Sequence, residues 1–246
     1  MLPKNKFPYI IRCKNTFALL ALTLVVLSGG SCKKDDPVIR PSHERYYPLE
    51  KGMWREYLVD STVFRGSTFY PNDSMQFAVR EEIDSTFIDK TGALNYIIRT
   101  YSRENENGNW NLRYVSAAKV NEMRAELLYN NDRYVKLIFP VVSGQGWNAN
   151  IYNDEDPENE RKSKYLTAHQ PATINGRSFD STLTVEVQNH TDAIFYEFET
   201  EQYAAGVGLI QHIWEELETQ PDPDDKTKFV RRGHLYKKIL TAYGRK

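Results

Sequence analysis

The chain has 246 residues, with 32 basic and 33 acidic side chains and a formal net charge of −1 at pH 7. No basic cluster stands out along the sequence, which argues against nucleic acid as a partner, because phosphate binding needs a basic surface. Only two cysteines are present, Cys13 and Cys32.

Residues 1–31 have the layout of a secretory signal peptide. A basic leader without acids precedes an apolar run from Phe17 to Leu27, and the small residues Ser28 to Ser31 follow. As a helix, the apolar run would reach roughly 16 Å, well short of a hydrocarbon core of about 30 Å. We therefore expect residues 1–31 to be cleaved rather than to span a membrane.

Cys32 follows the small residues directly. Its position resembles the lipobox of bacterial lipoproteins, in which this cysteine is acylated and becomes the mature N-terminus. The family usually has Leu three residues before the cysteine, where this chain has Gly29. The resemblance implies a lipid anchor on Cys32, and two or more acyl chains hold a protein stably on a bilayer. The alternative is an ordinary secretory signal with a chance cysteine.

Cleavage would change both the thiol content and the charge. The leader carries Cys13, so the mature chain would keep one cysteine and form no disulfide. It also carries four of the 32 basic residues and none of the 33 acids, which leaves 28 against 33 and a net charge of −5.

Residues 32–45 are expected to be the lipidated N-terminus and a linker. The charged segment Lys33 to Asp36 has nothing to bury, and Pro37 and Pro41 keep the chain extended. The segment resembles the export signal of surface-exposed Bacteroidota lipoproteins, although a solvated tether would have similar composition. The expected location is thus the outer membrane, with surface-exposed and periplasmic facing both open.

We expect residues 46–246 to form one all-β domain. Period-two alternation is clearest at 77–87 and 179–187, where apolar residues share one face. Short strands and turn signals without long helical segments favour an antiparallel meander closing toward a barrel or sandwich. Further strands are expected at 54–64, 94–98, 110–118, 123–129, 134–139, 194–201 and 229–240.

The segment from Leu209 to Leu217 fits either an amphipathic helix or a strand. We favour a strand, because Gly206 and Gly208 just before it suit a tight bend or bulge entering a sheet.

Three stretches carry a resemblance to known proteins: residues 47–57, 139–147 and 203–210. They resemble uncharacterised Bacteroidota cell-envelope lipoproteins in which an aromatic opening strand and a Gly-Val-Gly-Leu bend recur on a β-meander. The resemblance implies a fold and a compartment, and it supplies no catalytic residues.

Residues for chemistry are sparse, and the sequence predicts no catalytic residue, cofactor or metal site. No phosphate loop or nucleophile elbow is present. The acidic stretches 154–160 and 222–225 could hold calcium but lack the ligand order of a known loop, which favours solvated turns. The five histidines include no pair at metal spacing and are expected on the surface, namely His43, His169, His190, His212 and His234.

Two hypotheses concern aromatic and hydroxyl side chains. A sheet face lined by the tryptophans together with some of the many tyrosines could stack sugars or cradle a lipid, although the favoured interpretation is that these rings fill the core; the tryptophans are Trp54, Trp110, Trp147 and Trp214. Four Asp-Ser pairs are similar to the acceptor of Bacteroidota O-glycosylation and make four serines candidate sites, namely Ser61, Ser74, Ser85 and Ser181.

The sequence as a whole favours a non-enzymatic, membrane-anchored envelope lipoprotein that serves in binding or envelope assembly, with a glycan or hydrophobic molecule as the candidate ligand. The alternative is a surface hydrolase acting on glycan or lipid. A clustered carboxylate or Ser/His constellation in an open cleft would favour the enzyme, and a closed apolar cavity would favour a carrier.

Overall fold

The computed structural model describes residues 43–105, 107–153 and 160–246. The described residues all belong to one compact unit. The expected signal peptide and Cys32 lie outside them. Among the described residues, no helix has the length and apolar character needed to cross a membrane.

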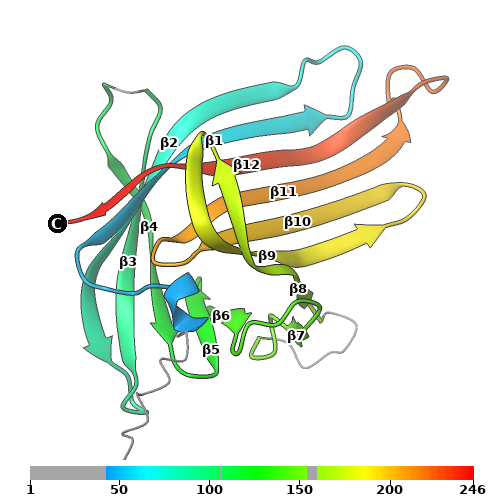
Figure 1. Ribbon diagram of the computed structural model, residues 1–246. Helices are drawn as coiled ribbons and strands as arrows, with labels where there is room; N and C mark the ends of the chain where they lie inside the picture. The colour runs from blue at the N-terminus through cyan, green and yellow to red at the C-terminus, as the bar shows by residue number, and fades with distance from the viewer. Residues whose placement is uncertain (1–42, 106, 154–159) are drawn as a thin grey trace, which may run out of the picture. The chain divides into compact units, whose positions relative to one another are not determined.

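The described unit is all-β, as predicted, with twelve antiparallel strands in one sheet (Figure 1). The order is β6-β5-β4-β3-β2-β1-β12-β11-β10-β9-β8-β7, so that the chain's first and last strands pair with each other. A short 3-10 helix, η1 (His43–Tyr46), precedes the sheet. The strands are β1 (Met53–Arg65), β2 (Asp73–Ile88), β3 (Leu94–Arg103), β4 (Asn111–Val120), β5 (Arg124–Tyr129), β6 (Asp132–Ile138), β7 (Gly146–Asn148), β8 (Lys162–Ile174), β9 (Arg177–Thr191), β10 (Phe195–Ala204), β11 (Gly208–Pro221) and β12 (Phe229–Arg245).

The ambiguous segment is a strand, β11, as favoured from the sequence. Gly208 opens it at φ +94°, a backbone conformation that L side chains rarely adopt. The register between β10 and β11 shifts next to this position, between Gln202 and Tyr203, so the expected bulge is present.

The sequence did not predict strands β7 and β8. Strand β8 carries Pro171, which cannot donate to a ladder, and its register with β9 shifts three times. A strand this irregular does not alternate cleanly, so its pattern is hidden in the sequence. Strand β7 has only three residues, too few to show any period.

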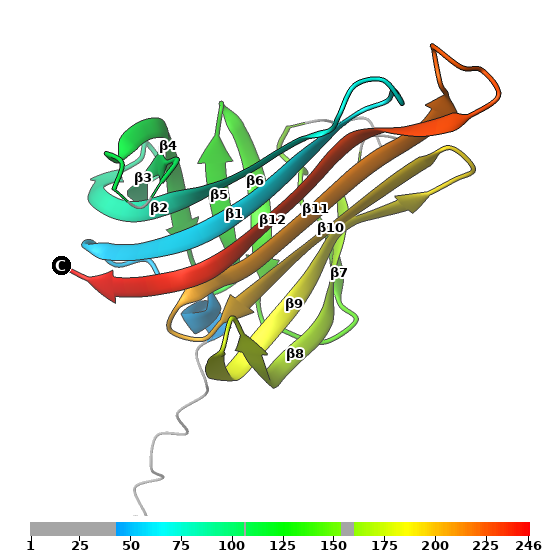
Figure 2. The same cartoon turned by 90° about the horizontal axis from the view of Figure 1, so that it is seen from above.

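The sheet curls until its two edges almost meet, which supports the barrel-like form of the prediction (Figure 2). We call the contacts between the two edges the seam. The backbone N–H of Val135 in β6 donates to the carbonyl of Ala149, just after β7, at 2.8 Å. The indole of Trp147 donates to the Val135 carbonyl at 2.9 Å. The Tyr165 hydroxyl donates to the Ile138 carbonyl at 2.6 Å and accepts from the Ile138 N–H at 3.0 Å.

Helix η1 packs against one end of the curled sheet (Figure 1). Its Tyr46 is fully buried, and the Tyr46 hydroxyl lies 2.7 Å from Nδ1 of His169 and 2.6 Å from Oγ of Ser181. The ring of His43 accepts a hydrogen bond from the Val141 N–H at 2.8 Å. These contacts tie the start of the described chain to strands far along the sequence.

The hairpins β1–β2 and β11–β12 run past the curled part of the sheet, and their loops are joined (Figure 2). Asp222 is 0% exposed and accepts hydrogen bonds from the Thr68 N–H at 3.1 Å and the Thr68 hydroxyl at 2.5 Å. The Ser67 hydroxyl donates to Asp224 at 3.1 Å. The prediction of a solvated turn at 222–225 is therefore wrong for Asp222, whose buried carboxylate connects the two loops by hydrogen bonds. In the other acidic stretch, residues 154–159 lie outside the described residues.

Candidate functional site

The inside of the curled sheet holds a partly open cavity of about 400 Å³. Every strand except β7 contributes a side chain to its lining, because alternate residues of each strand point inward. Such a volume lies in the range of small-molecule sites. Unlike most such sites, the wall mixes tyrosine rings with charged groups, which are Arg55, Glu81, Lys136, Arg161, Glu199, Glu201, His212 and Lys238.

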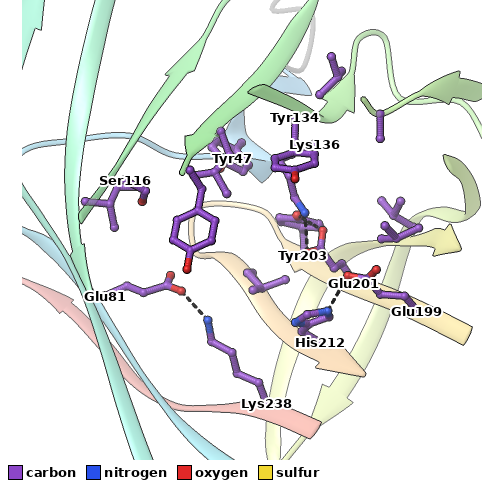
Figure 3. Close-up of a pocket in the computed structure, with 18 of the residues that line it drawn as sticks. Tyr47, Glu81, Ser116, Tyr134, Lys136, Glu199, Glu201, Tyr203, His212 and Lys238 are labelled. Atoms are coloured by element: carbon purple, nitrogen blue, oxygen red, sulfur yellow. Dashed lines mark hydrogen bonds and ion pairs between the residues drawn. The ribbon is translucent and has the colours of Figure 1, made fainter. Parts of the chain in front are cut away.

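One group of charges centres on Glu81 and is called the Glu81 cluster (Figure 3). Its carboxylate forms an ion pair with the ammonium of Lys238 and accepts a hydrogen bond from the Tyr57 hydroxyl at 3.3 Å. Nε of Arg55 lies 3.9 Å from it. Burial alone would raise the pKa of Glu81, but the charges of Lys238 and Arg55 outweigh burial and lower it. Glu81 is therefore a carboxylate at neutral pH.

Arg55 is held in place by the bend before β11. It is 7% exposed, and its Nη1 donates to the Val207 carbonyl at 3.1 Å. A Cβ at position 208 would lie 2.1 Å from that nitrogen, so Gly208 is needed for this approach. The buried Nε of Arg55 has no hydrogen-bond partner among the described residues, and a buried donor of this kind costs free energy unless a water or ligand satisfies it.

A second group lies across the cavity and is called the Glu199–Glu201 cluster (Figure 3). The ammonium of Lys136 lies 2.7 Å from Glu201, and the Tyr203 hydroxyl donates to the same carboxylate at 2.5 Å. Glu199 contacts Nε2 of His212 at 2.9 Å and the guanidinium of Arg161 at 2.5 Å. Both carboxylates come from β10, two residues apart, and so face the same side.

The electrostatics of this cluster keep both carboxylates ionised. Burial would raise the pKa of Glu201, but Lys136, His212 and the hydrogen bond from Tyr203 outweigh burial and lower it to about 2. The pKa of Glu199 is lowered as well, because the hydrogen bond from His212 and nearby positive charge outweigh burial.

Glu199, Glu201 and His212 place three potential ligand atoms within 4.8 Å of one another, close enough to hold a metal ion. The donor set does not fit that role as it stands. All four carboxylate oxygens already accept from a neighbouring donor, and the cations of Lys136 and Arg161 balance the two negative charges. We therefore describe the cluster as a charge-balanced network.

This cluster was not visible in the sequence, because its members come from β6, β10, β11 and the residue before β8, and they meet only through the order and register of the curled sheet. The expectation that all five histidines lie on the surface is wrong for His212, whose side chain is only 20% exposed and lines the cavity.

The pKa values of the cavity carboxylates do not match what a glycoside hydrolase requires of its general acid. A general acid for glycoside cleavage must hold its proton near neutral pH, which requires a raised pKa. The three cavity carboxylates all have lowered pKa values. They are thus suited to accepting hydrogen bonds rather than to donating a proton.

The four tryptophans each have a different partner. Trp54 lies under the guanidinium of Arg80, with 4.8 Å to the ring centroid, and Trp110 lies in the same way under Arg103 at 4.5 Å. Trp147 belongs to the seam. Trp214, in β11, stacks on His234.

The candidate O-glycosylation sites differ in access. Ser74 is exposed, whereas the other three are half-buried. The hydroxyl of Ser181 lies 2.6 Å from that of Tyr46 and accepts from Arg45 at 3.3 Å, and Ser85 donates to Asp84 at 3.1 Å. Modification of these serines remains a prediction from the sequence.

No family model and no curated protein matches the chain. Two crystal structures are similar to it. One is an inferred exported protein with a YMCC-like fold from Bacteroides fragilis, with 9% identity, a TM-score of 0.43, and coverage of 80% of this chain and 98% of that chain. The other is an inferred lipoprotein from Parabacteroides distasonis, with 9% identity, a TM-score of 0.43, and coverage of 81% of this chain and 98% of that chain.

Proposed function

We propose that this protein is a lipid-anchored protein of the cell envelope that binds a small polar organic molecule in the cavity of its β-sheet. The observation that carries the binding proposal is the cavity wall itself. About 400 Å³ of space is surrounded by ionised carboxylates, ammonium and guanidinium groups and tyrosine rings. Such a wall offers hydrogen-bond donors and acceptors together with flat apolar faces.

The polarity of the wall narrows the class of ligand. A lipid chain placed beside Glu81 or Glu201 would desolvate charges without replacing their hydrogen bonds, which is unfavourable. Four fixed cations face three carboxylates in the lining, so the wall offers little net charge to a highly charged ion. A neutral or singly charged polar molecule suits this environment.

The anchor part of the proposal rests on the sequence. The basic leader, the short apolar run and the small residues before Cys32 support export and acylation. We expect wild-type protein to partition with membranes after cell fractionation and to lose its leader. We expect Cys32→Ala to remain unprocessed or to leave the membrane fraction, and equal processing with membrane retention would refute the anchor.

Ligand binding is tested by filling the cavity. Ser116 is 7% exposed and lines the wall, so Ser116→Trp would occupy the space. The neighbouring Val115 is 48% exposed, and Val115→Trp is the matched control. Full-length protein from its native membranes should carry a non-covalent small molecule in native mass spectrometry, which Ser116→Trp loses and Val115→Trp keeps. Identical spectra without any adduct from all three proteins would contradict the proposal.

The hydrolase alternative has one observation in its favour, the grouping of Glu199, Glu201 and His212. The lowered pKa values of both carboxylates make it the weaker account. If the wild type turned over a glycoside or ester substrate and Glu201→Gln abolished that turnover, the hydrolase would become the stronger account.

A further inference from the structure

The cavity face of the sheet continues beyond the cavity along strands β10, β11 and β12. His212 and Lys238 line the cavity and are direct partners across β11 and β12. Two residues further out along the same strands, Trp214 is opposite Tyr236, and then Glu216 is opposite His234. Because the period of a strand is two, these side chains share the face of His212 and Lys238.

Strand β10 supplies the third row of this face. Glu201 is opposite His212, and Glu197 is opposite Glu216, with no register shift between these pairs. We call the outer part of the face the platform, and its members are Glu197, Trp214, Glu216, His234 and Tyr236.

The aromatic rings of the platform form contacts along the sheet. Trp214 and His234 are stacked, with 5.8 Å between ring centroids and 7° between ring planes. Tyr236 meets the cavity residue His212 edge to face at 5.5 Å. His234 is exposed, and Trp214 and Tyr236 are half-buried. A row of rings thus leads from the cavity wall to the solvent.

The two carboxylates of the platform, Glu197 and Glu216, lower the stability of the fold because they are neighbours of like charge. Glu197 and Glu216 are directly opposite each other, and like charges in this arrangement are destabilising. Within the described part of the chain, neither forms an ion pair. Their other cross-strand neighbours are histidines, His190 for Glu197 and His234 for Glu216, and a ligand rich in hydroxyl groups would donate to both carboxylates.

We infer that the ligand is a neutral oligosaccharide that extends from the cavity onto the platform, an inference that rests on the proposed binding function. The faces of pyranose rings present C–H groups that pack on flat rings such as Trp214 and His234, and their edges present hydroxyls that donate to carboxylates such as Glu197 and Glu216. The two adjacent negative charges repel an acidic saccharide, and their desolvation disfavours a lipid.

The test uses the full-length lipoprotein in detergent and isothermal titration with named probes. The neutral probes are maltohexaose, cellohexaose and mannohexaose, and the acidic probe is hexagalacturonate. We expect at least one neutral probe to bind and hexagalacturonate to bind more weakly. Trp214→Ala should weaken binding about three- to tenfold, the range for one lost aromatic contact.

Controls separate recognition from folding. Trp110→Ala removes a tryptophan far along the sequence, next to β4, and should bind as the wild type does. His234→Ala changes an exposed side chain and should weaken binding even if Trp214→Ala fails to fold. Absence of binding by every neutral probe, preference for hexagalacturonate, or equal affinity of the Trp214, His234 and Trp110 variants would overturn the inference. The proposed binding function would survive each of these results if Ser116→Trp still removes the native adduct, and would fail if no adduct is found or if Ser116→Trp keeps it.

Discussion

The ammonium of Lys136 lies 2.7 Å from the carboxylate of Glu201, and this ion pair joins the edge strand β6 to β10 across the inside of the curled sheet. In the order of the sheet, these strands are separated by seven others. The pair therefore connects two walls of the cavity that are otherwise linked only by backbone hydrogen bonds passing through all the strands between them. It fixes both the shape and the charge of the candidate site.

Removal of one member should show how much the fold depends on this pair. The side chains of Lys136 and Glu201 are 18% and 6% exposed, so Lys136→Met would leave an unpaired carboxylate in a largely buried place. We expect the free energy of unfolding to fall by about 3 kcal/mol, measured by urea denaturation. The double variant Lys136→Met/Glu201→Gln should regain part of this loss. An unchanged midpoint for Lys136→Met would show that the pair is solvated.

Stability should also depend on pH through the same carboxylate. The pKa of Glu201 is about 2 in the folded protein and near 4.3 in an unfolded chain. The folded state therefore binds fewer protons than the unfolded state between these values, and its stabilisation is complete above about pH 4.5 and is lost as the pH falls toward 2. Glu81 and Glu199 act in the same direction. Denaturation at a series of pH values should show a steeper acid loss for wild type than for Glu201→Gln, and parallel curves would contradict this assignment.

The seam offers a prediction about local opening. Tyr165→Phe removes the hydroxyl that both donates to and accepts from the backbone of Ile138. The variant leaves the carbonyl and N–H of the half-buried Ile138 without these partners, at a cost of about 1–3 kcal/mol. Hydrogen exchange should accelerate at Ile138 and Val135, while amides in the β1–β12 ladder stay protected. Equal acceleration in both places would mean that the seam does not open on its own.

Two glycines with positive φ should respond differently to alanine. A Cβ at Gly233 would lie 1.9 Å from the backbone oxygen of Glu216, whereas a Cβ at Gly92 would have nothing within 4 Å. Gly92→Ala should cost only the backbone strain, about 1 kcal/mol. Gly233→Ala must displace β11 as well and should cost about 3 kcal/mol or more. Thermal unfolding of the two variants compares their stabilities directly. Equal losses of stability would contradict the close contact of Gly233 with β11.

Much of the fold was predictable because period-two alternation reports which face of a strand is buried. It located strands such as β2 and β9, and Gly206 and Gly208 correctly favoured a strand for β11. It failed where backbone geometry departs from that period, as in β8 with Pro171 and repeated register shifts.

The site was less predictable for a different physical reason. Glu81 and Lys238 are 157 residues apart, and Lys136 and Glu201 are 65 residues apart. Their meeting depends on the order and curl of the strands, and no local spacing encodes it. The sequence did contain one indication of the site, a charged residue at an inward-facing position of a strand. Glu199 and Glu201 alternate with the period of two that places them on the same face of β10 as the aromatic Tyr203. A buried position that holds a charge needs a partner, so such residues mark a polar cavity once the strand is recognised.

The central claim, that the cavity holds an organic ligand, is tested most directly by a crystal structure of the protein purified from its native membranes without exogenous ligand. We predict continuous density for a polar molecule between the Glu81 cluster and the Glu199–Glu201 cluster, within hydrogen-bond distance of Arg55, Lys136 or Glu201. A cavity that contains only separate ordered waters, in protein whose native mass shows no adduct, would contradict the account.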